Sequence, residues 1–90
     1  MPTYLVETYM PRSHAPEVRA AARRARAAAE QFAGEGTAVR YVRTTFLPDD
    51  ETCFHLFQAV SADVVAEVSR RAKLGRVRVA PAIEARGHAK

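Results

Sequence analysis

The chain has 90 residues, which is enough for one small domain with a thin core. Fourteen Lys and Arg residues against ten Asp and Glu residues give a formal net charge of +4, which permits anionic partners without requiring them. One cysteine excludes an internal disulfide, and the chain shows neither a signal-peptide pattern nor about 18 consecutive apolar residues, so we expect a cytoplasmic protein that does not cross a membrane.

The first third of the chain predicts a strand followed by a helix. Residues 3–10 alternate imperfectly, as a half-buried strand does, and Pro11 ends the strand. Apolar side chains then recur at helical spacing over residues 16–33, with Pro16 in the first turn, and the stripe consists of Val18, Ala22, Ala25, Ala29 and Phe32. Gly34 and Gly36 are expected to end this helix, because glycine readily adopts the left-handed conformation of a C-terminal cap.

The middle of the chain predicts a β-hairpin. Residues 40–46 and 52–58 are rich in β-branched and aromatic side chains, which fit a pleated surface. Between them, residues 48–51 read Pro-Asp-Asp-Glu, a composition typical of turns. The acidic cluster is therefore interpreted as a turn, because it lacks the glycine and the distant glutamate of a calcium-binding loop.

A second helix and a last strand complete the chain. Ser61 is placed as the N-cap with Asp63 in the first turn, and the buried stripe consists of Val64, Val65, Val68 and Ala72. Glu67 and Arg71 are expected to pair on the solvent side, since they are four residues apart, and Gly75 is expected to end the helix. Residues 76–80 alternate as a strand whose valine face Ile83 extends, and Pro81 assigns that strand to a sheet edge.

This element order predicts an α+β, ferredoxin-like βαββαβ sandwich over residues 1–86, with residues 87–90 as a flexible tail. Both helices should cover one face of a four-stranded antiparallel sheet. The other face would remain open, yet the chain holds more large apolar side chains than one thin layer accommodates: Leu5, Tyr9, Phe54, Leu56 and Phe57. We therefore expect a homodimer formed through the open sheet face.

Four residues are candidate metal ligands. Cys53 and His55 are two positions apart on a strand, so they share a face, and a thiolate with an imidazole suits a borderline metal ion. Glu7 lies on the neighbouring strand and could join them; the alternative is a solvated Glu7 that pairs with Arg40 or Arg43. The alternative for Cys53 and His55 is a packed, hydrogen-bonded core pair. A Cys–His nucleophile would need a third orienting group that the sequence does not indicate.

Two surface features remain open. His14 precedes Glu17 by three residues in a loop, which would suit a surface site for a transition metal or an ordinary loop histidine. Arginines gather on and before the first helix, where they could hold RNA or acidic lipids or simply form its solvated face: Arg12, Arg19, Arg23, Arg24 and Arg26. We expect no nucleic-acid partner, because the third strand lacks the basic-Gly-aromatic pattern of RNA-recognition domains.

Most of the chain, from about residue 4 to residue 79, resembles the DUF4242 family of short bacterial proteins. The resemblance is carried by YLVETYMP at residues 4–11, VRYVRTTFLPDDETCF at residues 39–54 and FQA at residues 57–59. The studied relative in that family is a nickel-binding protein. The resemblance therefore implies a ferredoxin-like homodimer that takes up nickel at its surface, as a sink or store, without catalysis.

The expected nickel ligands are His14, His55, Cys53 and Glu7. Of these, Glu7 and Cys53 match positions of the family pattern, whereas the two histidines are chosen for their chemistry. No catalytic residue is assigned. The alternative is an enzyme similar to the small dimeric α/β-barrel monooxygenases and isomerases, with Glu7 or His55 as acid or base in a pocket on the open sheet face.

Overall fold

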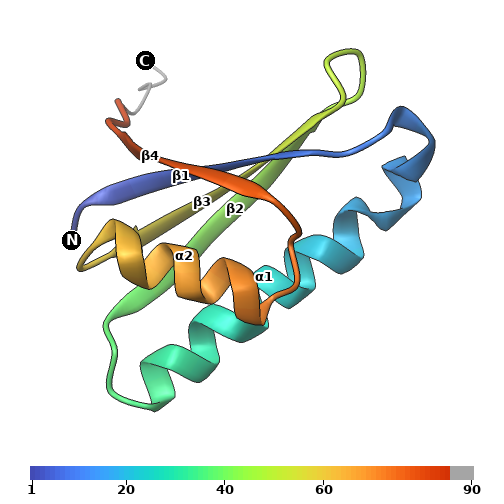
Figure 1. Ribbon diagram of the computed structural model, residues 1–90. Coiled ribbons are helices and arrows are strands. Elements are labelled where there is room, and N and C mark those ends of the chain that lie inside the picture. The colour runs from blue at the N-terminus through green and yellow to red at the C-terminus, as the bar shows by residue number, and fades with distance from the viewer. Residues whose placement is uncertain (86–90) are drawn as a thin grey trace, which may run out of the picture.

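The computed structural model describes residues 1–85, which form four strands, two α-helices and a short 3-10 helix. Figure 1 shows how these elements are arranged. The strands are β1 (Thr3–Tyr9), β2 (Val39–Leu47), β3 (Thr52–Ala59) and β4 (Val77–Ala82). The helices are η1 (Arg12–Glu17), α1 (Val18–Gly34) and α2 (Ala62–Arg71). The predicted tail at residues 87–90 lies outside the described residues.

The strands form one antiparallel sheet in the order β2-β3-β1-β4, and both helices cover the same face of it (Figure 1). This arrangement confirms the predicted ferredoxin-like βαββαβ fold. β4 pairs only with β1, so it is an edge strand and tolerates Pro81, which cannot donate a backbone hydrogen bond. Because the helices occupy one side, alternate side chains of each strand face either the helices or an open face.

The core lies between the sheet and the helices. Val6, Phe57, Val65 and Val68 have no exposed surface, and the ring of Tyr41 meets that of Phe57 edge to face at 5.8 Å. Helix α1 contributes Phe32, which is partly buried against the core, and four buried alanines: Ala21, Ala25, Ala28 and Ala29. The predicted stripe is confirmed at Ala25, Ala29 and Phe32. Ala21 and Ala28 are buried in place of Val18 and Ala22, because an alanine-rich helix offers apolar surface on several sides and tertiary packing selects the face.

The first helix begins later than predicted. Pro16 lies in the 3-10 helix η1, and α1 starts at Val18 with no side-chain cap on the preceding Glu17. Its end agrees with the prediction, since Gly34 is the last helical residue and Gly36 turns the chain with φ +97°.

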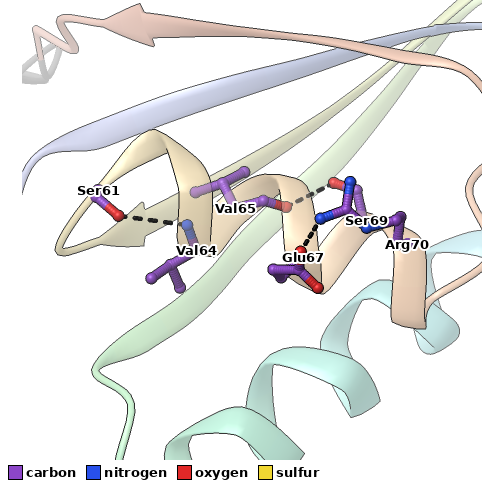
Figure 2. A network of polar contacts seen from close by, with 6 residues as sticks. All are labelled: Ser61, Val64, Val65, Glu67, Ser69 and Arg70. Carbon is purple, nitrogen blue, oxygen red and sulfur yellow. Dashed lines mark hydrogen bonds and ion pairs between the residues drawn. The ribbon is translucent and has the colours of Figure 1, made fainter.

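The second helix begins as predicted. The Ser61 Oγ accepts a hydrogen bond from the Val64 N–H at 3.3 Å (Figure 2). Asp63 lies in the first turn of the helix. The expected Glu67–Arg71 pair is wrong: Glu67 pairs with Arg70, as Figure 2 shows.

Arg71 points toward the first helix instead. Its Nη1 lies 3.0 Å from Glu35 Oε2, and its guanidinium stacks over the Phe32 ring at 3.9 Å. The last strand also differs from the prediction, because Ile83 follows β4, is fully exposed and does not extend the buried face. Within the described residues, no helix is long and apolar enough to span a membrane.

Candidate functional site

Strand β3 presents two different chemistries on its two faces. Cys53, His55 and Phe57 point toward the helices and have no exposed surface. Phe54 and Leu56 alternate with them and therefore face the open side. The sequence prediction that Cys53 and His55 share a face is confirmed, and that face is the buried one.

An irregularity in β2 brings two hydroxyl groups to the same side. The pairing of β2 with β3 shifts between Tyr41 and Arg43, so that Thr44 lies opposite His55. Tyr41 and Thr44 are three residues apart and would face opposite sides of a regular strand. The bulge adds one residue and turns both toward the helices.

These side chains form a continuous polar chain inside the core. The Tyr41 hydroxyl oxygen is 2.7 Å from Thr44 Oγ1, and Thr44 Oγ1 is 2.8 Å from His55 Nδ1. His55 Nε2 is 3.7 Å from Cys53 Sγ. Among the described residues, no buried side-chain nitrogen or oxygen lacks a hydrogen-bond partner. The chain of four groups therefore satisfies both ring nitrogens of a fully buried histidine.

Burial keeps the side chains of His55 and Cys53 uncharged. Burial, and secondarily the Arg24 guanidinium, lower the pKa of His55 to about 4. Burial also raises the pKa of the Cys53 thiol. Arg24 is held in place by a hydrogen bond of 3.0 Å from its Nε to the carbonyl oxygen of Ala72, at the end of α2. At neutral pH the site thus holds a neutral imidazole and a protonated thiol.

The Cys53–His55 pair has the spacing of two ligands on one metal ion. Metal–sulfur and metal–nitrogen bonds of about 2.3 and 2.1 Å at a tetrahedral angle place the two donor atoms about 3.6 Å apart. The separation of 3.7 Å agrees with this value and equally with a hydrogen bond between the thiol and the ring. Within residues 1–85, however, no group of three or more His, Cys, Asp or Glu side chains is close enough to share an ion. The chain therefore supplies two ligands at this position.

Glu7 does not join the pair. It lies in register with Phe54 on one side and Arg78 on the other, on the open face of the sheet. Its Oε1 accepts a hydrogen bond from Arg78 Nη1 at 3.1 Å. The expectation that Glu7 lies beside Cys53 or His55 is therefore wrong. The solvated alternative is confirmed with a different arginine, because β4 flanks β1 and β2 does not.

His14 is also separate from the pair. It is exposed in η1, the segment that Arg12 links to the acidic turn between β2 and β3. The carboxylates of that turn are engaged with Arg12: its backbone N–H donates to Glu51 Oε2 at 2.8 Å, and its Nη2 lies 3.3 Å from Asp49 Oδ1. These contacts support the interpretation of the acidic cluster as a structural turn.

The open face carries a shallow hollow of about 320 Å³. Its floor is apolar, and the ion pair between Arg43 Nη2 and Glu84 Oε2, at 2.5 Å, closes one side. The lining residues are Leu5, Arg43, Thr45, Phe54, Leu56, Ala82 and Glu84. Glu7 and His55 do not line it, and they lie on opposite faces of the sheet. Within residues 1–85, Glu7 and His55 therefore cannot line one pocket together, as the enzyme alternative would allow.

The sequence does not predict the part that three residues play at the buried site. Tyr41 and Thr44 join His55 only because of the bulge, for which the sequence offers no glycine signal. Arg24 lies on α1, 31 positions earlier than His55, and acts on the site through its charge, although in the sequence it looks like part of a solvated arginine face.

Comparison of this chain with protein-family models, with curated proteins and with solved structures found no match. The resemblance to DUF4242 therefore stays a prediction.

Proposed function

We propose that this protein is a homodimeric binding protein for a divalent transition metal, with nickel as the first candidate, and that Cys53 and His55 supply its inner ligands. The single observation that carries the proposal is the 3.7 Å separation between Cys53 Sγ and His55 Nε2. The resemblance to a nickel-binding family supports the choice of metal. No catalysis is needed for this function.

The chemistry of the pair suits such an ion. Imidazole binds metals in its neutral form, and burial already keeps His55 neutral at physiological pH. Cys53 binds as a thiolate, so metal binding displaces the thiol proton. Nickel lies high in the affinity series for nitrogen and sulfur ligands, so two protein ligands can hold it once local opening admits water to the remaining coordination positions. Because both donor atoms are buried, we expect slow association that follows local opening of the sheet.

Cobalt(II) and nickel(II) titrations test the ligand assignment. Binding of cobalt by Cys53 should give a thiolate charge-transfer band in the near ultraviolet, and calorimetry should give the nickel affinity. Cys53→Ala and His55→Gln should each weaken binding at least tenfold. The matched controls His14→Ala and Glu7→Gln should leave both readouts unchanged. Nickel binding of undiminished strength in the Cys53→Ala/His55→Gln double variant, with native circular dichroism, would refute the assignment.

We also propose that the open sheet face forms the dimer interface. Leu5, Phe54 and Leu56 make an apolar strip there, flanked by the Arg43–Glu84 and Arg78–Glu7 ion pairs. Opposite charges at the rim of an apolar strip suit a two-fold interface, in which the same patch meets itself.

Sedimentation velocity tests the interface. Phe54→Glu should convert the dimer to a monomer, because it places a charge in the strip. Val60→Glu serves as the control, since Val60 is exposed outside the hollow and should leave the dimer intact. A wild-type protein that sediments as a monomer at 100-fold different loading concentrations would contradict the proposal.

The second candidate is a small-molecule enzyme that uses the open-face hollow. Its volume of about 320 Å³ lies at the lower end of ligand pockets, and Arg43 could orient an anionic group. Titration with the fluorescent probe 1-anilinonaphthalene-8-sulfonate separates the two accounts. Saturable binding by the dimer that Arg43→Gln weakens would favour the pocket. An absence of binding would favour a dimer that fills the hollow.

A further inference from the structure

We propose that the hollow between helices α1 and α2 binds a small organic phosphate. The hollow has a volume of about 430 Å³, which falls in the range of small-molecule sites. It lies on the helical side of the sheet, away from the open face, and it shares no residue with the Cys53–His55 pair (Figure 1). The proposal therefore does not depend on the metal site, and the proposed dimer would leave the hollow accessible.

The lining of the hollow combines a small apolar floor with a cationic rim. The floor consists of Ala27, Ala28 and Ala72, whose short side chains leave space between the two helices. Three cationic side chains form the rim: Arg24, Arg71 and Lys73. Within residues 1–85, no Asp or Glu side chain lines the hollow. A concave surface with this excess of positive charge attracts an anion.

Arg24 is held in a fixed orientation at the edge of the hollow. Its Nε donates a hydrogen bond of 3.0 Å to the carbonyl oxygen of Ala72, the residue that follows α2. Its two terminal Nη groups make no hydrogen bond or ion pair to the described part of the chain. A guanidinium fixed in this way can donate two hydrogen bonds to a phosphate at little cost in entropy. The bond to Ala72 also covers a carbonyl oxygen at the negative end of α2, which would otherwise repel an anion.

Lys73 occupies a position that usually belongs to glycine. It follows the C-cap of α2 in the left-handed conformation, with φ +57°, and its backbone N–H donates to the carbonyl oxygen of Arg70 at 3.0 Å. Backbone strain at a residue other than glycine is common at binding sites. The Lys73 side chain is exposed and forms no ion pair within residues 1–85, so its charge is available to a ligand.

Arg71 contributes shape more than charge. Its guanidinium stacks over the Phe32 ring at 3.9 Å, and its Nη1 lies 3.0 Å from Glu35 Oε2, which offsets its charge. The charge of a ligand is therefore balanced mainly by Arg24 and Lys73. Two such cations match a phosphate monoester, which carries a charge of about −1.5 to −2 at neutral pH.

The surroundings of the hollow favour a small ligand over a membrane or an RNA. Among the described residues, no large hydrophobic side chain is exposed on α1 or α2, so the helices offer nothing to insert into a bilayer. No free aromatic ring lines the hollow for a base to stack on, because Arg71 covers Phe32. Inorganic phosphate would fill only part of the volume. The rest of the ligand, a sugar for example, would lie on the alanine floor beside the Gln31 amide.

NMR titration of the full chain tests the site. Proton–nitrogen correlation spectra recorded with glucose 6-phosphate at fixed ionic strength should show saturable shifts concentrated at residues 24–31 and 71–73. Inorganic phosphate should bind there about tenfold more weakly, because it makes no contact with the floor. Glucose should cause no shift. The absence of saturable shifts with glucose 6-phosphate would overturn the proposal, and equal affinities for the two phosphates would overturn its organic part.

Variants of the lining provide the second readout. Arg24→Gln and Lys73→Gln should each weaken binding of glucose 6-phosphate about tenfold, because each removes a charge-assisted hydrogen bond. Arg23→Gln is the matched control, since Arg23 is exposed on the same helix outside the hollow. Ala27→Leu should also weaken binding, because it fills the hollow without a change of charge, whereas Ala33→Leu elsewhere on α1 should not. Undiminished affinity in Lys73→Gln, with native circular dichroism, would refute the assignment.

Two further assays separate a free phosphate ligand from larger anions. Sedimentation with phosphatidylglycerol vesicles reports binding to a lipid surface, and fluorescence anisotropy with labelled oligouridylate reports binding to RNA. We expect neither to bind at physiological salt. Binding of either one that Lys73→Gln abolishes, in a protein that does not bind glucose 6-phosphate, would assign the hollow to that larger partner and overturn the proposal.

Discussion

Protonation of His55 should make the fold sensitive to mild acid. The His55 pKa is about 4 in the folded protein, compared with an ordinary value of 6.5. Above pH 6.5 the imidazole is neutral in both the folded and the unfolded states, so protonation of His55 does not lower the free energy of unfolding. As the pH falls from 6.5 toward 4, the unfolded chain binds a proton that the folded chain excludes, and stability is lost.

The size of this loss follows from the same two values. A difference between 6.5 and about 4, at about 1.4 kcal/mol per pH unit, corresponds to about 3 kcal/mol of unfolding free energy. Below pH 4 the loss levels off, because both states are then protonated. Stability of small domains is about 5–15 kcal/mol, so this single buried ring governs a large share of it.

Urea denaturation followed by circular dichroism at pH 7.5, 6, 5 and 4 measures the effect. Wild type should lose about 3 kcal/mol more than His55→Gln over this range, because glutamine does not titrate and the carboxylates titrate alike in both proteins. His14→Gln serves as the control and should follow wild type, since His14 is exposed. Parallel pH profiles for wild type and His55→Gln would refute the account of a buried, neutral histidine.

Three further changes test the local structure. Ser61→Ala should lower the free energy of unfolding by about 1 kcal/mol through loss of the α2 N-cap, and Ser13→Ala in exposed η1 should leave it unchanged within error. Lys73→Gly should raise the melting temperature, because Lys73 has φ +57° and release of that strain is worth about 1 kcal/mol; a lowered temperature would contradict this. A double-mutant cycle of Glu7→Gln and Arg78→Gln should give less than about 1 kcal/mol of coupling, decreasing with added salt, since the pair is partly exposed.

The sequence predicts the buried site only in part. The alternation of β3 predicts that Cys53 and His55 share a face, because side chains on a strand repeat every two residues. Whether that face is buried depends on which side the helices pack. The adjacency of β1 and β3 permits Glu7 to join the pair, but the pairing register sets it opposite Phe54 instead. A register shift of one residue would have reversed that outcome.

The amino-acid sequence by itself determined the order of elements, the hairpin and the Ser61 cap. These features depend on neighbours within a few residues, whose chemistry is visible in the chain. Only the tertiary structure decided the bulge that joins Tyr41 and Thr44 to His55, and the approach of Arg24 from α1. Contacts between residues far apart in sequence arise from packing and strand register, which short-range patterns do not encode.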